Sequence, residues 1–395
     1  MKIVVVGCGI GGLTVASFLA DNGHDVIVYD QFIKAAPVGS GLVIQPVGLE
    51  ILKKLGLADD ALAKGARGYR MLGLEADTGR KVLNVSYGEL DGDSFGLGIH
   101  RSSLFDILFR AAQQRQIQIV PGNRVVHSSL VEGLRMLELE NGEQTGPFEL
   151  VIDASGVQSK LSPLCAKELP FGAIWGTVDW PENTSLQYNQ LEQRYRKASN
   201  MIGILPIGSL PDENKKKATL FWSMPKGDYD LWLKTDLQNW QAAAVALWPE
   251  LSPFVRQITR HEQMTMARYS HGQLFKPYAE RLVFIGDAAH RASPQLGQGA
   301  NMALLDAYAL ACALELYSPA AAFRAYAKAR RNHVMLYQAL SWAFTPMYQS
   351  NSKLLPLLRD LVLAPMSQMP PVAAMLTSLV KGSMVDACKG LGKSG

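Results

Sequence analysis

The N-terminal stretch IVVVGCGIGG, residues 3–12, decides the fold of this chain of 395 residues. Its first four residues form a short β-branched run that is typical of a buried parallel strand. Gly7, Gly9 and Gly12 follow at the spacing GxGxxG, and apolar residues then recur at helical spacing until Asn22 and Gly23. A strand, a glycine turn and a helix in this order predict a unit that binds the phosphates of a dinucleotide.

The next predicted strand supplies a carboxylate where such a unit needs one. Residues 26–29 are apolar and end at Asp30, 18 residues after Gly12. The N-terminus of the intervening helix favours negative phosphates, and an acidic residue at this place accepts hydrogen bonds from ribose hydroxyls. The pattern predicts dinucleotide binding but does not distinguish FAD from NAD.

Composition and charge exclude several classes of protein. Hydrophobic residues make up 48% and charged residues 19%, so the chain can bury a large core and is not disordered. The net charge of +4 comes without a long basic run, so nucleic acid is not indicated. We find neither a signal-peptide pattern nor an uncharged apolar stretch of about 18 residues, and we expect no integral membrane segment.

The four cysteines point to a reducing compartment. Cys8, Cys165, Cys312 and Cys388 lie far apart, and no two of them form a C-x-x-C pair. A disulfide framework and a zinc site are therefore not expected, and we predict no metal. Together with the missing leader, this pattern predicts a cytoplasmic protein.

The texture of the chain changes between about residues 171 and 274. Six of the seven tryptophans fall there, among strand patterns at 202–207 and 218–224, whereas residues 282–301 return to a strand followed by a glycine-rich loop. We therefore predict an α/β fold in which a β-rich substrate domain is inserted into a discontinuous dinucleotide-binding domain. The predicted divisions are 1–70, 98–170 and 275–330 for the dinucleotide domain, 71–97 and 171–274 for the substrate domain, and 331–395 for a C-terminal helical segment.

Prolines shape our expectation for that last segment. Pro346, Pro356, Pro365 and Pro370 are expected to divide it into short helices. Its proline-interrupted, leucine-rich part, residues 354–379, favours core packing or a dimer contact over contact with a membrane or a partner helix.

The second glycine loop, RLVFIGDAAHRASPQLGQGAN at residues 281–301, is more specific than the first. A buried strand ends at Gly286 and Asp287, and Gly297 and Gly299 allow backbone to approach a flat ligand closely. A helix begins near Gly299, and its positive end suits the negative charge of a reduced flavin ring. Asp287 can hydrogen-bond a ribityl hydroxyl.

These motifs, with IHRSSL at 99–104, resemble the family of FAD-dependent aromatic hydroxylases typified by para-hydroxybenzoate hydroxylase, the class A flavoprotein monooxygenases. The resemblance covers nearly the whole chain and implies FAD held across a GR2-type Rossmann-like fold. It implies that Arg101 and Asp287 contact FAD, with Pro294 and the loop 297–299 beside the isoalloxazine ring. The expected cofactor-binding residues are Gly7, Gly9, Ile10, Gly11, Gly12, Asp30, Gln31, Gly41, Arg101, Val125, Gly286, Asp287, Pro294, Gly297, Gln298, Gly299, Ala300 and Asn301.

One departure from the family pattern concerns residues 153–162, DASGVQSKLS. Ser155 stands where the family has an aspartate, and Ser162 or Pro163 stands near its usual arginine, whereas Ser159 is retained. The family motif is linked to the FAD pyrophosphate and to the use of nicotinamide nucleotides. FAD binding is still expected, but efficient reduction by NADPH or NADH is an open question.

The resemblance implies an FAD-dependent monooxygenase that hydroxylates an aromatic or conjugated small molecule with O₂ and NAD(P)H through a flavin C4a-hydroperoxide. The cofactor carries this chemistry, which explains why the sequence identifies no catalytic side chain. Trp222 and Met224, on a predicted strand of the inserted domain, are candidate contacts to a flat substrate. We expect a monomer or a homodimer.

Two alternatives stay open. A flavin-dependent dehydrogenase or reductase of the same fold, which does not use NAD(P)H in the usual way, is favoured by Ser155. A non-catalytic flavin-binding or redox-sensing protein would hold FAD without turning over an electron donor.

Overall fold

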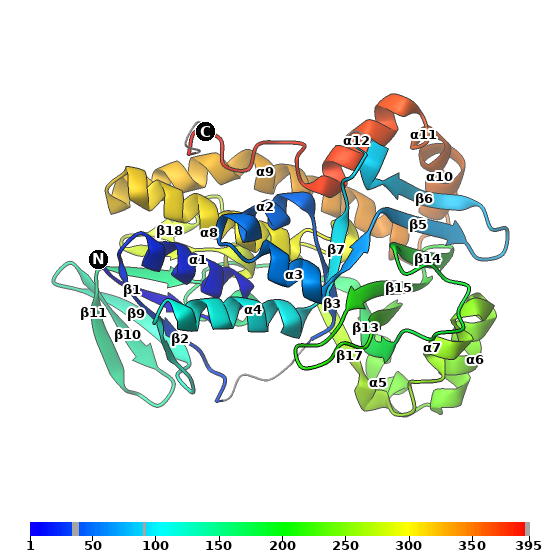
Figure 1. Ribbon diagram of the computed structural model, residues 1–395, viewed down its shortest axis with the longest axis horizontal. Coiled ribbons are helices and arrows are strands. Elements are labelled where there is room, and N and C mark those ends of the chain that lie inside the picture. Colours follow the sequence, from blue (N-terminus) through cyan, green and yellow to red (C-terminus); the bar gives the residue numbers. More distant parts are fainter. Residues whose placement is uncertain (34–38, 90–91, 392–395) are drawn as a thin grey trace.

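The computed structural model describes residues 1–33, 39–89 and 92–391 (Figure 1). Residues 34–38, in the loop before the expected flavin contact Gly41, and residues 392–395 of the predicted C-terminal segment lie outside this description. Figure 1 shows a part that holds both the N-terminal strand and helix α9, and a second part built from the green and light-blue strands. The red C-terminal helices lie beside the second part.

A six-stranded sheet carries the N-terminal glycine turn. All its strand pairs are parallel except the outermost pair, which is antiparallel. The order in space is β18 (Tyr278–Ala279), β19 (Leu282–Phe284), β12 (Leu150–Asp153), β1 (Lys2–Val6), β2 (Asp25–Tyr29) and β8 (Gln118–Val120).

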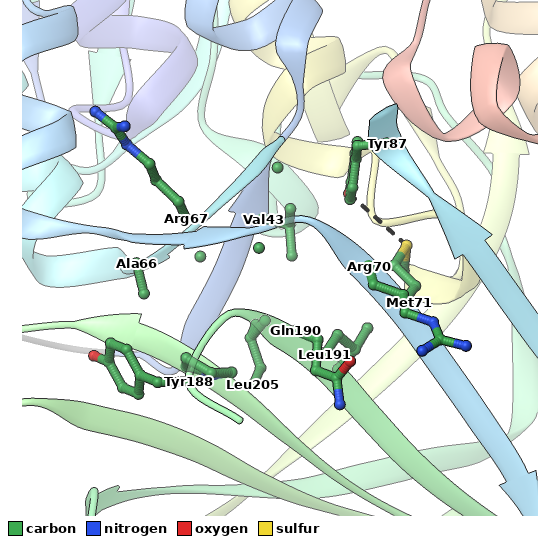
Figure 2. Close-up of a pocket in the computed structure, with 14 residues that line it drawn as sticks. Val43, Ala66, Arg67, Arg70, Met71, Tyr87, Tyr188, Gln190, Leu191 and Leu205 are labelled. Carbon is green, nitrogen blue, oxygen red and sulfur yellow. Dashed lines mark hydrogen bonds between the residues drawn. The ribbon is translucent and has the colours of Figure 1, made fainter. Parts of the chain in front are cut away.

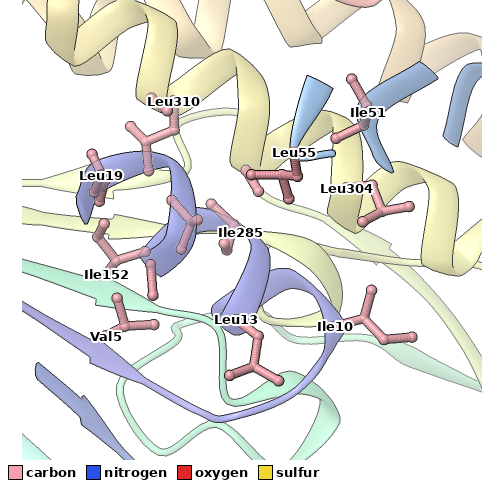
Figure 3. Packing of buried hydrophobic residues seen from close by; sticks show 14 of the residues in the cluster. Val5, Ile10, Leu13, Leu19, Ile51, Leu55, Ile152, Ile285, Leu304 and Leu310 are labelled. Carbon is pink, nitrogen blue, oxygen red and sulfur yellow. The ribbon is translucent and has the colours of Figure 1, made fainter. Parts of the chain in front are cut away.

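Alternation along β1 explains how this sheet is covered on both faces. Ile3 and Val5 pack into the largest hydrophobic cluster with helices α1 (Ile10–Asp21), α4 (Arg101–Gln114) and α8 (Gly299–Leu316), as Figure 3 shows for Val5 and its neighbours. Val4 and Val6 pack on the other side, against a three-stranded sheet of β9 (Val125–Val131), β10 (Leu134–Leu139) and β11 (Gln144–Phe148). Both faces of β1 are therefore buried, as its unbroken apolar run predicts.

A second large sheet has eight strands and is mostly antiparallel. One of its faces packs on α5 (Tyr229–Trp232), α6 (Leu237–Leu247) and α7 (Ser252–Val255) through a tryptophan-rich cluster. Its strands, in spatial order, are β20 (His290–Arg291), β17 (Met264–Gln273), β13 (Lys167–Asp179), β16 (Lys217–Pro225), β15 (Asn200–Gly208), β14 (Gln190–Arg196), β5 (Arg70–Glu75) and β6 (Lys81–Ser86).

Smaller elements join the two large sheets. A three-stranded sheet has the order β3 (Gly41–Ile44), β7 (Gly96–His100) and β4 (Ala66–Gly68). Helices α2 (Pro46–Lys54) and α3 (Ala58–Lys64) follow β3. The C-terminal region contains α9 (Pro319–Tyr348), α10 (Leu355–Leu358), a π-helical turn (Arg359–Leu363), α11 (Ala364–Met366) and α12 (Pro370–Lys381).

The expectation that Pro346 breaks the chain was wrong by a few residues. Helix α9 contains Pro346 and continues to Tyr348, where Gln349 N donates to Thr345 O at 2.8 Å. A proline in the last turn removes only one hydrogen bond of the helix, and this loss is small beside the packing of a helix of 30 residues.

Among the described residues, helix α8 is the one helix whose length and apolar composition would allow it to span a membrane. However, 61% of it is buried inside the protein. It contacts α1, α2 and α9, and its side chains Leu304 and Leu310 belong to the core drawn in Figure 3. Its apolar character is thus explained by packing between other helices.

A buried carboxylate connects α8 to its surroundings. Asp306 has no exposed surface and accepts hydrogen bonds from Gly286 N at 2.9 Å and Arg330 Nε at 2.6 Å. His290 Nε2 lies 2.7 Å from Asp306 Oδ2, the same oxygen that accepts the hydrogen bond from Gly286 N. Burial alone would raise the pKa of Asp306, but the charges and hydrogen bonds of His290 and Arg330 hold it well below its usual range.

Gly12→Ala should prevent the glycine turn from forming, whereas Gly9→Ala should leave folding intact. A Cβ at Gly12 would lie 1.9 Å from the carbonyl oxygen of Gly7, but a Cβ at Gly9 would meet nothing within 4 Å. We expect Gly12→Ala to lower the melting temperature of the FAD-free protein strongly or to yield aggregated protein. Equal melting temperatures for the two variants in a thermal scan would contradict this account.

Stability should fall as the pH drops below about 6.5, and His333 should contribute to that fall. Burial, followed by the charge of Arg330, lowers the pKa of His333 from 6.5 to about 3. Between these values the unfolded chain binds a proton that the folded chain does not, so acid favours unfolding by about 1.4 kcal/mol per pH unit. Urea unfolding from pH 7 to pH 4 should show a shallower pH dependence for His333→Gln. His127→Gln, at an exposed histidine, serves as the control and should follow the wild type.

Candidate functional site

A cavity of about 760 Å³ lies between the glycine turn, the eight-stranded sheet and the C-terminal helices. Twelve of the eighteen expected cofactor-binding residues line it, although they come from four separate parts of the chain. They are Gly9, Ile10, Gly11, Gly41, Arg101, Gly286, Asp287, Pro294, Gly297, Gln298, Gly299 and Ala300.

The N-terminal glycine turn forms one end of the cavity. Gly7 has a φ of +106°, and a Cβ there would lie 2.5 Å from the carbonyl oxygen of Ala154, so this turn closes on the end of β12 only with glycine. Gly9 precedes the first turn of α1 and, with Gly11, borders the cavity. The unpaired N–H groups of this helix end therefore face open space that suits a phosphate.

Three of the expected residues lie at or beyond the edge of this arrangement. Asp30 directly follows β2, and its carboxylate accepts hydrogen bonds from Cys8 N and from Phe32 N at 3.0 Å, so it braces the turn. Gln31 is exposed and pairs with Gln158. Val125 is buried beneath the sheet, where its side chain packs with Leu137 and Phe148. None of the three lines the cavity, and their contact with a cofactor stays a prediction.

Opposite charges meet deeper in the cavity. Asp287 follows β19 and is exposed to the cavity, where desolvation by the surrounding protein raises its pKa. Arg101 begins α4 directly after His100, whose ring accepts a hydrogen bond from Ser102 N and so fixes the helix start. Arg291 Nε donates to Asp287 O at 2.9 Å. In the described part of the chain the Arg101 guanidinium makes no hydrogen bond, so its donors are available to a ligand.

The second glycine loop holds buried polar atoms without protein partners. Gln298 Nε2 donates to Val380 O at 2.7 Å, but its Oε1 has no partner among the described residues. Gln45 Nε2, beside Gly297, is also buried and unpaired within the described chain. Asn301, by contrast, is fully engaged with Gln45 N and with Val43 O. Unpaired buried groups are costly, and Gln298, unlike Gln45, lines the cavity, so a polar ligand edge at this loop would satisfy its Oε1.

The departure at Ser155 has a structural counterpart. Asp153 is buried and accepts hydrogen bonds from Ser155 N, Ser155 Oγ and Ser159 Oγ. Burial raises its pKa, which these bonds oppose. Ser162 Oγ donates to Ala288 O at 2.6 Å and ties this loop to the second glycine loop. The serine hydroxyls thus bind protein groups, while Ala154, Gly156 and Val157 face the cavity.

Aromatic side chains form the wall opposite the glycine loops. The rings of Trp175 and Phe221 stack with centroids 4.6 Å apart, and Trp175 Nε1 donates to Tyr269 OH at 3.0 Å. Tyr195 and Tyr348 pack together at 5.3 Å and also line the cavity. The sequence does not predict this wall, because each of these aromatic residues comes from a different strand or helix.

The structure corrects the expected substrate contacts Trp222 and Met224. Both lie on β16 but face the helices α5–α7, where Trp222 packs against Trp240. The cavity meets the other face of this strand, which carries Phe221. Neighbouring residues of a strand point to opposite faces of the sheet. The prediction selected the wrong face, because Trp222 and Met224 point into the tryptophan-rich core and Phe221 points into the cavity.

The C-terminal helices close a third side of the cavity. Leu363, Met366, Met375 and Leu379 line it beside Val82 and Val85 of β6. The sequence does not predict this role, because nothing local in a leucine-rich stretch shows which distant strand it covers.

A much smaller pocket of about 20 Å³ lies between the three-stranded sheet and the edge of the eight-stranded sheet (Figure 2). Val43, Met71, Leu191 and Leu205 border both this pocket and the large cavity. Its volume admits little more than one water molecule, so it is not a substrate site. Within the described residues no group of three or more His, Cys, Asp or Glu side chains could hold a metal ion.

Comparison with known proteins agrees with this geometry. A family model described as an FAD binding domain matches residues 1–337. The chain is 25% identical to 3-amino-4-hydroxybenzoate 2-monooxygenase of Streptomyces cremeus, over 84% of this chain and 83% of that protein. It is 24% identical to 6-hydroxynicotinate 3-monooxygenase of Bordetella bronchiseptica, over 86% and 90% of the two chains.

Solved structures share the fold across the whole length. Klebsiella pneumoniae HpxO, complexed with FAD and uric acid, superposes with a TM-score of 0.81 at 19% identity and covers 98% of each chain. A 2-methyl-3-hydroxypyridine-5-carboxylic acid oxygenase superposes with a TM-score of 0.78 at 22% identity, over 98% of this chain and 99% of that one. With the family match over most of its length, the chain belongs to the FAD-binding domain family of flavoprotein monooxygenases.

Proposed function

We propose that this FAD-dependent monooxygenase hydroxylates a flat aromatic or heterocyclic small molecule with O₂ and a reduced nicotinamide nucleotide. The observation that carries the proposal is the single cavity that joins both glycine motifs to a wall of aromatic rings. Its volume of about 760 Å³ lies within the range of ligand sites, ~300–1,000 Å³, although FAD and a substrate must share it.

The chain's own residues fit FAD by position and chemistry. Gly9 and Gly11 would present helix N–H groups to the pyrophosphate, and Arg101 would add its guanidinium donors. Asp287 would accept from a ribityl hydroxyl. The start of α8 at Gly299 and the unpaired oxygen of Gln298 would face the polar edge of the ring. FAD, when bound, supplies the redox chemistry.

The aromatic wall would position the substrate and exclude water. Trp175 and Phe221 are held by stacking, and Tyr269 is fixed by its hydrogen bond to Trp175. Flat aromatic faces favour a flat substrate, and a rigid wall loses little entropy on binding. The relatives named for amino-hydroxybenzoate and hydroxynicotinate support a ring substrate of this size.

We infer that residues 1–70, 98–170 and 275–330 form the FAD domain, that 71–97 and 171–274 form the substrate domain, and that 331–395 form the helical segment. The eight-stranded sheet, which draws most of its strands from the two substrate segments, supports this division. We also propose a cytoplasmic location, and a monomer or homodimer.

The alternative is a dehydrogenase or reductase of the same fold. Ser155 and Ser162 favour it, because in this chain the family's aspartate and arginine are replaced by hydroxyls that bind protein groups. Such an enzyme would take electrons from its substrate and place no oxygen in the product.

Anaerobic reduction of the FAD-loaded protein should distinguish these functions. We expect NADPH or NADH to bleach the flavin absorbance, faster when a hydroxylated benzoate or pyridine is present. Under ¹⁸O₂, one labelled oxygen should then appear in the product by mass spectrometry. Flavin that neither nucleotide reduces with any ring compound, together with an unlabelled oxidised product, would support the dehydrogenase instead.

Phe221→Ala should weaken substrate binding, whereas Trp222→Phe on the neighbouring position should not. Loss of an aromatic contact costs roughly 1.4 kcal/mol, so KM for the ring compound that incorporates oxygen should rise about tenfold. Trp222→Phe should lower the melting temperature while KM stays within about twofold of wild type, because its ring packs in the core. The reverse pattern of KM values would place the substrate on the other face of β16.

A further inference from the structure

In the helical stretch 355–366 the charged side chains are buried and apolar side chains are exposed. Its two charged residues, Arg359 and Asp360, are buried, and Arg359 Nε donates to Asp360 Oδ1 at 2.6 Å. The residues that point to solvent are apolar and recur at spacings of three and four, which is one face of a helix. This C-terminal apolar face consists of Leu354, Leu357, Leu358, Leu361, Val362 and Met369, which are 43–75% exposed.

The buried charges of this stretch are fully used by the protein. Arg359 also donates to Met347 O at 3.0 Å and Lys197 O at 3.2 Å, and its guanidinium lies 5.1 Å from the ring centre of Tyr195. These bonds fix how the helix is rotated about its axis. The apolar face therefore cannot turn inward without unpairing a buried arginine, which is strongly unfavourable.

Exposed basic residues lie near the stretch that carries the C-terminal apolar face. This basic collar consists of Arg80, Lys81, Lys197 and Lys353, all of them exposed. Arg80 NH2 lies 3.6 Å from Asp360, the backbone of Lys197 accepts from Arg359, and Lys353 directly precedes the face. Figure 1 shows α10 and α11 at the edge of the molecule beside β5 and β6.

Acidic groups near the collar do not cancel it. Asp77 is paired with Arg196 at 2.6 Å and Asp360 is buried beside Arg359, whereas Glu75 keeps its charge. Among the described residues, the exposed Lys81, Lys197 and Lys353 outnumber that carboxylate, so the charge near the apolar face is positive and complements an anionic layer.

The C-terminal apolar face continues into the large cavity. Met366 and Met375 are 46% and 47% exposed and also line the cavity, as does Leu363. A layer that covers the apolar face would therefore reach the cavity wall formed by α11 and α12.

We propose that the C-terminal apolar face docks on an anionic lipid surface, with its leucines in the interface and the basic collar on the headgroups. A helix that lies in such an interface buries its apolar face in the acyl boundary and keeps cations at headgroup level. The contact is peripheral, and it needs no spanning helix.

A second copy of this chain fits the same surface less well. In a symmetric dimer the same patch meets itself, so the two basic collars would approach each other and repel. Lipid phosphates supply the opposite charge that a second copy lacks.

Vesicle flotation with the FAD-loaded protein tests the proposal. We expect binding to vesicles of phosphatidylcholine with phosphatidylglycerol, weaker binding to phosphatidylcholine alone, and release at about 1 M salt, where screening acts within ~3 Å. Leu357→Ser combined with Leu361→Ser should lower the partition coefficient at least about tenfold. Leu231→Ser, at a 67% exposed leucine on α5, is the matched control and should bind as wild type.

Absence of binding to either kind of vesicle would overturn the proposal, as would equal losses in the double variant and in Leu231→Ser. Binding that neutral vesicles support equally would remove the role of the basic collar. A wild-type dimer in size-exclusion chromatography that the double variant dissociates, without vesicle binding, would assign the face to a second copy. Flavin reduction is measured separately, so this result and the proposed hydroxylation can fail independently.

Discussion

The carboxylate of Asp306 holds together the parts of the molecule on which the site depends. It lies on α8, accepts a hydrogen bond from the backbone of Gly286 in the second glycine loop, and pairs with Arg330 on α9. A carboxylate without exposed surface is stable only when its charge is matched, and His290 and Arg330 supply that match. The turn that carries Asp287 is therefore fixed by one residue twenty positions further along the chain.

Arg330 also connects this buried carboxylate to the C-terminal region. Arg330 also donates to Ala387 O and lies beside His333, whose ring contacts Gly382 O at 3.1 Å. Gln298 reaches the same region through Val380 O. The second glycine loop and the end of α12 are thus held in one buried polar network. The cavity beside them keeps its shape because neither side can shift alone.

The glycine motifs were predictable because their chemistry is local. GxGxxG and the loop 286–301 each place their turn, helix start and carboxylate within a short stretch, so spacing alone indicated the geometry. Which face of β16 meets the cavity depends instead on what packs against each side of the sheet. Trp222 looked like a ligand contact by its type, yet the helices α5–α7 cover its face. A local sequence pattern does not show which distant helices cover a face of a strand. It therefore does not show which of the two faces of β16 meets the cavity.

The C-terminal region shows the same limit more sharply. The apolar residues of 354–379 were expected to pack in a core or at a dimer contact. Leu376 and Leu379 do pack in a core cluster, but Leu354 and Leu357 are exposed. Arg359 and Asp360 instead occupy the inward side, because the buried arginine stacks near Tyr195 and Tyr348 at the cavity wall. Once those charges are committed inward, residues one or two positions away, such as Leu358 and Leu361, must face outward. The exposed apolar surface is therefore a geometric consequence of how this helix completes the cavity, and the same rotation that closes the site creates the face that a lipid layer would cover.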